Sequence, residues 1–135
     1  MKIGVVVITH GKIAEELIKA TETIVKEKIL MAPVCVLQSD DTARYQKMIE
    51  EAITRVTQKG GVLLLSDMFG GTPSNLCLPF LKKGQVELVT GVNLPMLLKL
   101  ATVSENLELS QVVQFIKEYG QRNITIANEI LKGDS

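Results

Sequence analysis

The sequence predicts an α/β fold in which helices cover both faces of a doubly wound, mostly parallel sheet. Continuous apolar runs, typical of strands that are buried on both faces, recur along the chain without polar alternation. Between them lie segments whose apolar residues repeat at helical spacing, which indicates amphipathic helices. The connections are short, so right-handed crossovers should join the parallel strands, and we expect the strand order 2-1-3-4.

Four parallel strands are expected, followed by a short strand near the C-terminus. In chain order, the apolar runs that predict the parallel strands are Ile3–Ile8, Val34–Leu37, Val62–Leu65 and the shorter Val86–Thr90. Within Asn123–Asn128, Ile124 and Ile126 alternate with polar or small neighbours. This alternation predicts an antiparallel edge strand.

Two long amphipathic segments lie between the first three strands. The expected buried face of the first helix consists of Ile13, Leu17, Ala20 and Ile24, and that of the second consists of Tyr45, Met48, Ile49, Ala52, Ile53 and Val56. The segment Asp40–Thr42 supplies polar side chains that can cap the second helix, and Gly60–Gly61 follows its end.

Proline marks the start of two later helices. Thr72–Pro73 predicts a helix with Thr as its cap and Pro at the first helical position, and Leu94–Pro95 repeats this pattern. A last helix, over about Leu109–Tyr119, should end at Gly120.

The composition favours one domain that binds small molecules or other proteins. The chain has 135 residues, of which 46% are hydrophobic, so we expect a single domain with one core over residues 1–135. Fifteen basic residues balance fifteen acidic ones, and aromatic residues make up 4% of the chain. This argues against a nucleic-acid partner, which requires positive charge and aromatic side chains for base stacking.

The two cysteines, Cys35 and Cys77, lie far apart in apolar surroundings, without the CxxC spacing of metal and redox sites. We expect both to be core residues and, with one histidine in the chain, no metal site. The apolar stretch at the N-terminus is too short for the apolar region and cleavage site of a signal peptide, and no stretch approaches the roughly 20 apolar residues of a membrane span. A cytoplasmic, thiol-reduced location is therefore expected.

His10 is the one histidine of the chain and stands where the first apolar run ends, directly before Gly11. Its imidazole is the one side chain of the sequence whose ordinary pKa lies near neutral pH. The junction from a strand to a helix is also where α/β proteins hold phosphate on free backbone N–H groups. The position therefore predicts a phosphohistidine.

The loop Ser66–Pro73, directly after the third strand, is the second part of the predicted site. Its glycine pair permits close approaches that a side chain would prevent, and Thr72 opens a helix with free amides. In the expected strand order, the carboxyl ends of the first and third strands bring His10 and Asp67 together. A carboxylate that accepts a hydrogen bond from one ring nitrogen leaves the other free to attack phosphorus.

Two other classes of site fit the residues less well. The doubly wound pattern is compatible with a flavodoxin-like FMN site, but the loop Thr9–Lys12 has no run of Ser and Thr for the phosphate, and the chain has no Trp to stack on a flavin. A serine hydrolase requires a GxSxG motif, which the sequence lacks. The phosphohistidine interpretation requires no cofactor.

Three motifs follow the first, third and fourth predicted strands. They are Thr9–His10–Gly11, Asp67–Asn75 and Gly91–Leu97. Together and in this order they resemble the mannose-family IIA domain of the bacterial phosphoenolpyruvate:sugar phosphotransferase system. The resemblance extends over nearly the whole chain and implies a transferase that acts in sugar transport.

The resemblance implies that His10 accepts a phosphoryl group from the phosphocarrier HPr and passes it to a IIB component. Asp67 matches the carboxylate that orients the histidine, and Thr72 matches a Ser or Thr near the phosphoryl oxygens. We expect Gly11, Gly71 and Thr72 to bind the phosphate.

The resemblance also implies that two further residues contact a docking partner. Phe69 matches an aromatic position and forms an exposed lip for a partner, although packing under the loop fits the sequence equally well. Asn93, within Gly91–Asn93, lines a further wall of the site.

The resemblance also implies a homodimer in which the last strand, Asn123–Asn128, pairs with the partner's sheet. Many relatives continue into a linker and a IIB domain, whereas this sequence ends at Ser135. We therefore expect IIB on a separate chain, with membrane contact only through the transporter components. The alternative is a regulatory module whose phosphorylation state is read by another protein.

Overall fold

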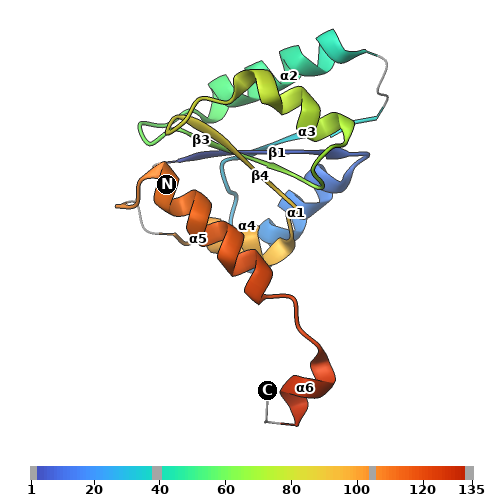
Figure 1. Ribbon diagram of the computed structural model, residues 1–135, viewed down its shortest axis with the longest axis vertical. Coiled ribbons are helices and arrows are strands. Elements are labelled where there is room, and N and C mark those ends of the chain that lie inside the picture. The colour runs from blue at the N-terminus through green and yellow to red at the C-terminus, as the bar shows by residue number, and fades with distance from the viewer. Residues whose placement is uncertain (1–2, 38–40, 104–105, 133–135) are drawn as a thin grey trace.

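The computed structural model describes residues 3–37, 41–103 and 106–132, and it shows an α/β fold (Figure 1). Four parallel strands form one sheet in the order β2-β1-β3-β4, which confirms the predicted order. The strands are β1 (Gly4–His10), β2 (Met31–Val36), β3 (Val62–Ser66) and β4 (Val86–Thr90). Each crossover carries the chain back along one face, so all four carboxyl ends lie at the same edge of the sheet.

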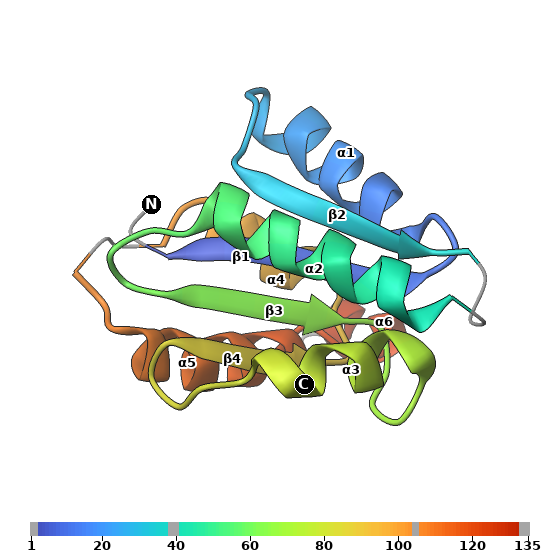
Figure 2. The ribbon, with the colours of Figure 1, turned by 90° about the horizontal axis from the view of Figure 1, so that it is seen from above.

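Helices cover both faces of this sheet, as Figures 1 and 2 show. They are α1 (Ile13–Val25), α2 (Thr42–Val56), α3 (Thr72–Cys77) with a following 3-10 turn (Leu78–Phe80), α4 (Leu94–Leu100), α5 (Leu109–Arg122) and α6 (Ala127–Leu131). Helices α2 and α3 pack on one face and α1, α4 and α5 on the other. Alternate residues of β1, such as Val6 and Val7, therefore enter two separate apolar clusters.

Strand β1 extends beyond the predicted run. Thr9 and His10 continue its parallel pairing with β2, opposite Cys35 and Val36. The side chain of Thr9 is fully buried and that of His10 is exposed. His10 is thus the last residue of a central strand, and its backbone position is set by the sheet.

The predicted face of α1 is wrong by about one residue. Ile13 and Ile24 are 47% and 54% exposed, whereas the buried residues of this helix are Ala14, Ile18 and Thr21. A polar residue can lie in this stripe because the Thr21 hydroxyl donates a 2.8 Å hydrogen bond to the Leu17 carbonyl. The predicted face of α2 is confirmed, with Tyr45, Ile49, Ala52 and Val56 buried and Met48 and Ile53 partly buried.

The helix caps only partly follow the prediction. Asp41 caps α2, since its carboxylate accepts from the Arg44 amide at 3.2 Å, while Asp40 lies outside the described residues. Thr72 is not the cap of α3 but its first residue, and Gly71 occupies the cap position in an extended conformation. The chain enters α3 through a glycine because this backbone lies against the His10 ring, where a side chain has no room.

Helix α5 does not end at Gly120 but runs to Arg122. Gly120 is buried in this helix against Met96 of α4, and a Cβ at this position would collide with the Met96 side chain. The glycine therefore serves close packing of two helices, and the sequence signal for a helix end was misleading.

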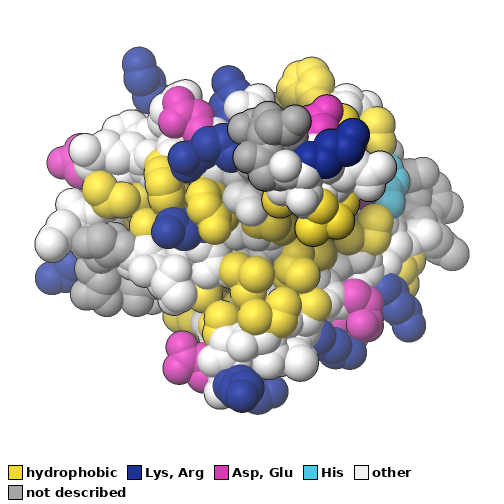
Figure 3. All heavy atoms as spheres, turned by 90° about the horizontal axis from the view of Figure 1, so that it is seen from below, with side chains coloured by type: hydrophobic (Ala, Val, Ile, Leu, Met, Phe, Trp, Pro, Cys, Tyr) yellow, Lys and Arg dark blue, Asp and Glu magenta, His cyan; other side chains and the backbone are white. Residues whose placement is uncertain are grey.

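The edge strand predicted over Asn123–Asn128 is not present in the described part of the single chain. After α5, residues 124–126 run on without pairing to a strand, and α6 follows at Ala127–Leu131 (Figure 1). Isoleucine and leucine side chains of this C-terminal segment are exposed, namely Ile124, Ile126, Ile130 and Leu131. Figure 3 views this side of the molecule and shows apolar side chains gathered on it. Within the described part of the single chain there is no partner strand for the alternating pattern to pair with, so the segment adopts a local structure instead.

Candidate functional site

His10 and Asp67 meet at the carboxyl edge of the sheet, because β1 and β3 are neighbours. Oδ2 of Asp67 lies 2.8 Å from Nδ1 of the His10 ring and also accepts a 3.1 Å hydrogen bond from the His10 backbone amide. The second carboxylate oxygen, Oδ1, accepts from the Met68 amide at 3.1 Å. Asp67 therefore holds both the ring and the backbone of the same histidine.

This geometry selects one tautomer of His10. A carboxylate accepts hydrogen bonds, so Nδ1 carries the proton and Nε2 carries the lone pair. The His10 side chain is 48% exposed and that of Asp67 only 17%. The arrangement presents an oriented, accessible ring nitrogen to the surface, with a shielded negative charge behind it.

Gly71 forms a wall beside this nitrogen. A Cβ built on Gly71 would lie 2.7 Å from Cε1 and 3.2 Å from Nε2 of His10. Thr72 follows as a half-buried residue, and no hydrogen bond joins its hydroxyl to another described residue. The structure thus brings the predicted residue Gly71 next to His10, and Thr72 follows Gly71 directly in the chain.

Gly11 lies in the turn between β1 and α1, and binding of a phosphate at this residue stays a prediction. The Gly11 amide donates to the Val36 carbonyl of β2 at 3.0 Å, so this amide is engaged within the protein. The residue has φ +53°, which turns the chain from β1 into α1. Gly11 supports the turn behind His10.

The two residues implied in docking differ in exposure. Phe69 is 72% exposed and its neighbour Met68 is 53% exposed, so both project from the loop after β3 and Phe69 does not pack beneath it. Asn93 is half-buried and fully engaged: Oδ1 accepts from the Met96 amide at 3.2 Å, and Nδ2 donates to the Gly120 carbonyl at 3.1 Å. Asn93 caps α4 and ties it to α5, and its expected part in docking stays a prediction.

Two buried hydroxyls that support the site were not predicted. Oγ1 of Thr9 accepts from the Ala14 amide at 2.7 Å and so fixes the start of α1 beside His10. Ser74 of α3 bonds to the Gly70–Gly71 backbone. Small polar residues next to glycines at a strand end or a helix start are the sequence signal that could have identified them.

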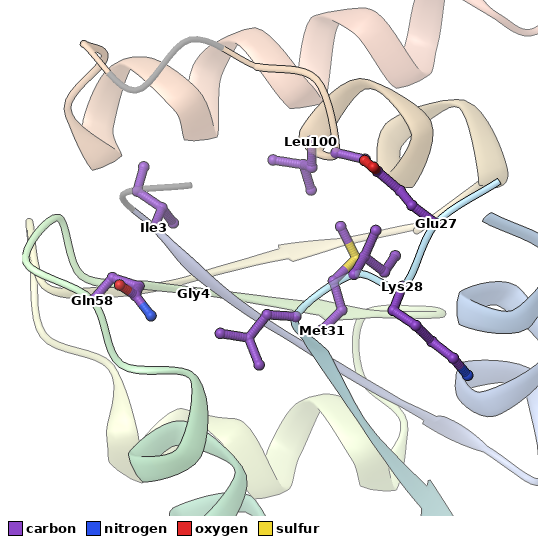
Figure 4. Close-up of a pocket in the computed structure, with 10 residues that line it drawn as sticks. Ile3, Gly4, Glu27, Lys28, Met31, Gln58 and Leu100 are labelled. Atoms are coloured by element: carbon purple, nitrogen blue, oxygen red, sulfur yellow. The ribbon is translucent and has the colours of Figure 1, made fainter. Parts of the chain in front are cut away.

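The site is open and does not coincide with an enclosed cavity. A cavity of about 290 Å³ lies at the opposite, amino end of β1 and is lined by residues such as Ile3, Met31, Gln58 and Leu100 (Figure 4). Among the described residues, no group of three or more His, Cys, Asp or Glu is placed to hold a metal ion, and no helix is long and apolar enough to span a membrane. An exposed nucleophile beside apolar side chains is better suited to a protein partner than to a small enclosed substrate.

Comparisons with known proteins agree with this arrangement. The model of the family described as "PTS system fructose IIA component" matches residues 4–117. The PTS system fructose-specific EIIA component of Bacillus subtilis is 28% identical over 131 residues, which cover 96% of this chain and 90% of that protein. The mannose-specific EIIAB component of Escherichia coli K12 is 26% identical, and the match covers 92% of this chain but 39% of that protein.

A solved structure shares the fold over almost its full length. The PTS IIA protein associated with the fucose utilization operon of Streptococcus pneumoniae superposes with a TM-score of 0.81 at 21% identity, covering 97% of each chain.

Proposed function

The chain belongs to the family of PTS system fructose IIA components, and from this premise we propose that it carries a phosphoryl group on Nε2 of His10 within a sugar phosphotransferase system. The observation that supports the proposal is the 2.8 Å contact of His10 Nδ1 with Asp67, which leaves Nε2 as an exposed nucleophile. The donor is HPr and the acceptor is a IIB component.

The transfer step requires little beyond what these residues supply. The bond between Nε2 and phosphorus forms as the bond between phosphorus and the donor atom breaks, and the donor leaves with that electron pair. Nδ1 keeps its proton throughout, so the phosphorylated imidazole is positively charged. The Asp67 carboxylate, with both oxygens held by backbone amides, stabilises this charge at 2.8 Å.

In this proposal, Gly71 and Thr72 form the binding site of the phosphoryl group. The absence of a side chain at Gly71 leaves space beside Nε2, and the Thr72 hydroxyl, which bonds to no other described residue, is available to donate to a phosphoryl oxygen. Phe69 and Met68, exposed on the same loop, supply apolar contact area for the partner that approaches His10. The name of the Escherichia coli relative, an EIIAB component, supports a IIB unit as the acceptor.

The direct test is phosphorylation in a reconstituted system. The chain is incubated with phosphoenolpyruvate, enzyme I and HPr, and acid-labile phosphate on it is measured. We expect one phosphoryl group per chain, none on His10→Ala, and transfer onward when a IIB protein is added. Undiminished labelling of a folded His10→Ala variant would contradict the proposal.

We further propose that the chain forms a homodimer through its C-terminal segment. β4 lies at the edge of the described sheet, and a groove of about 440 Å³ between β4 and α5 is lined by Val89, Val113 and Ile124 among others. The exposed isoleucines of the segment after α5 can pair with this edge in a second copy. Light scattering should give a dimer for the whole chain and a monomer when it is truncated after Arg122. The Ile24→Ser variant, which removes an exposed apolar side chain from α1, serves as the control and should stay dimeric; a truncated chain that stays dimeric would exclude this segment.

A further inference from the structure

We propose that Ser74 is a positioning residue for phosphoryl transfer at His10, and that it acts through the backbone of Gly70 and Gly71. This inference rests on the proposed function of His10. Ser74 lies in the first turn of α3 and is 1% exposed. A buried hydroxyl must find hydrogen-bond partners within the protein, and the partners of Ser74 belong to the loop that borders His10.

Oγ of Ser74 connects both sides of the glycine pair. It accepts a hydrogen bond from the Gly70 amide at 3.0 Å and donates one to the Gly71 carbonyl at 3.0 Å. One hydroxyl therefore closes a small ring around two residues that have no side chains of their own to hold them. Gly70 has φ +87°, a conformation that glycine adopts easily but also leaves easily.

Few other hydrogen bonds hold this part of the loop. The Asn75 amide donates to the same Gly71 carbonyl at 3.0 Å, as the first bond of α3. On the other side of the glycines, Asp67 accepts from Met68, and the Ser66 hydroxyl donates to the Met68 carbonyl at 3.4 Å. The Gly70 amide is held by Ser74, and among the described residues Ser74 is the side chain that bonds to both glycines.

The glycine pair matters because Gly71 borders the reacting nitrogen. The Cβ that Gly71 lacks would stand 3.2 Å from Nε2, so the Gly71 backbone is the wall of the space that the phosphoryl group enters. A displacement of about 1 Å at a reacting centre can cost up to about a hundredfold in rate. Loss of the hydrogen bonds that join Ser74 to Gly70 and Gly71 therefore slows transfer, although Ser74 itself does not touch His10.

The test compares Ser74→Ala with Thr21→Val. Thr21 is also a fully buried residue in a helix, but its hydroxyl donates to the Leu17 carbonyl within α1 and not to the loop after β3. Both variants lose one buried hydroxyl, so both should lose thermal stability. Only Ser74→Ala should lower the transfer rate at saturating phosphorylated HPr, by about tenfold or more, with a smaller change in the HPr concentration that gives half the maximal rate.

A spectroscopic measurement separates this inference from the proposed function. His10 is the one histidine of the chain, so its ring ¹H–¹⁵N signals need no assignment. We expect Ser74→Ala to shift these signals and to speed hydrogen exchange at the Gly70 amide, while Thr21→Val leaves both unchanged. Ser74→Cys, which replaces the hydroxyl by a somewhat larger group that forms weak hydrogen bonds, should lie between Ser74→Ala and the wild type, and it replaces Ser74→Ala if that variant does not fold.

Each outcome is decisive. Wild-type transfer rates and ring signals in folded Ser74→Ala would overturn the inference, and so would equal losses in Ser74→Ala and Thr21→Val. A wild-type chain that accepts no phosphate would refute the proposed function instead, and the ring signals would then still decide whether Ser74 positions the wall beside Nε2.

Discussion

Gly71 approaches the imidazole of His10 so closely that a Cβ on residue 71 would stand 2.7 Å from Cε1 of the ring. Carbon atoms in contact are normally separated by about 3.5 Å or more. The ring and the loop therefore fit together only because residue 71 has no side chain.

Replacement of this glycine is the first prediction. In Gly71→Ala the new methyl group should push the His10 ring from its place or cover Nε2, and the rate of phosphorylation by HPr should fall about ten- to a hundredfold. The measurement is the initial rate of acid-labile labelling. Gly84→Ala is the control, because a Cβ at Gly84 would meet no atom within 4 Å and this residue lies outside the site. Equal rates in the two variants would rule out a wall at Gly71.

Asp67→Asn tests the charge behind the ring. The amide keeps the size of the carboxylate but has no negative charge to stabilise the phosphorylated imidazolium, so we expect transfer to slow on the order of a hundredfold in a folded protein. The ¹⁵N shifts of the His10 ring should also show a change in the tautomer population, since an amide can donate to Nδ1 as well as accept from it. A variant with unchanged rate and tautomer would exclude the orienting role of Asp67.

Asn93→Ala should affect stability and not transfer. It removes the side-chain cap of α4 and the bond to the Gly120 carbonyl, which links α4 with α5. Loss of a cap together with a buried hydrogen bond costs about 1–3 kcal/mol in the free energy of unfolding. Urea denaturation measures this loss, while the labelling rate below the transition should match the wild type. A slower rate with unchanged stability would instead support the docking role expected of Asn93.

Burial of Cys77 predicts a pH dependence of stability. Desolvation raises the pKa of its thiol from 9.0 to about 12, because the buried thiolate loses its hydration. The thiol is thus harder to ionise in the folded state, so its contribution to stability is present below about pH 9 and is lost as the pH rises toward about 12. Between these values, the free energy of unfolding should fall less steeply in Cys77→Ala than in the wild type. Cys35→Ala, at a half-buried position, provides the comparison; identical slopes in all three proteins would refute the prediction.

The parts of the fold that the sequence predicted correctly are those with strong local signals. The parallel strands have continuous apolar runs, and their order follows from the rules for crossovers, so the sequence alone places His10 and Asp67 together. The prediction of the buried face of α1 was wrong because two overlapping stripes of this helix are both largely apolar. Which stripe is buried depends on whether the Thr21 hydroxyl finds a hydrogen-bond partner in its own helix.

Other differences arose where a residue serves a distant contact. Gly120 has the sequence signature of a helix end, but it accommodates Met96 of another helix. The pattern of Asn123–Asn128 finds no strand to pair with among the described residues of one chain. Such contacts between remote segments are not encoded in any local window of the sequence.

One edge of the His10 ring is exposed, and this limits the order in which the phosphoryl donor and acceptor can bind. Asp67 occupies the Nδ1 edge, Gly71 lies against the Cε1 side, and the ring is 48% exposed. In the proposed relay, donor and acceptor would have to reach the same nitrogen from the same side, so they would compete for one binding surface on each chain. Turnover then depends on how fast the spent donor departs, and an excess of unphosphorylated HPr acts as an inhibitor of onward transfer.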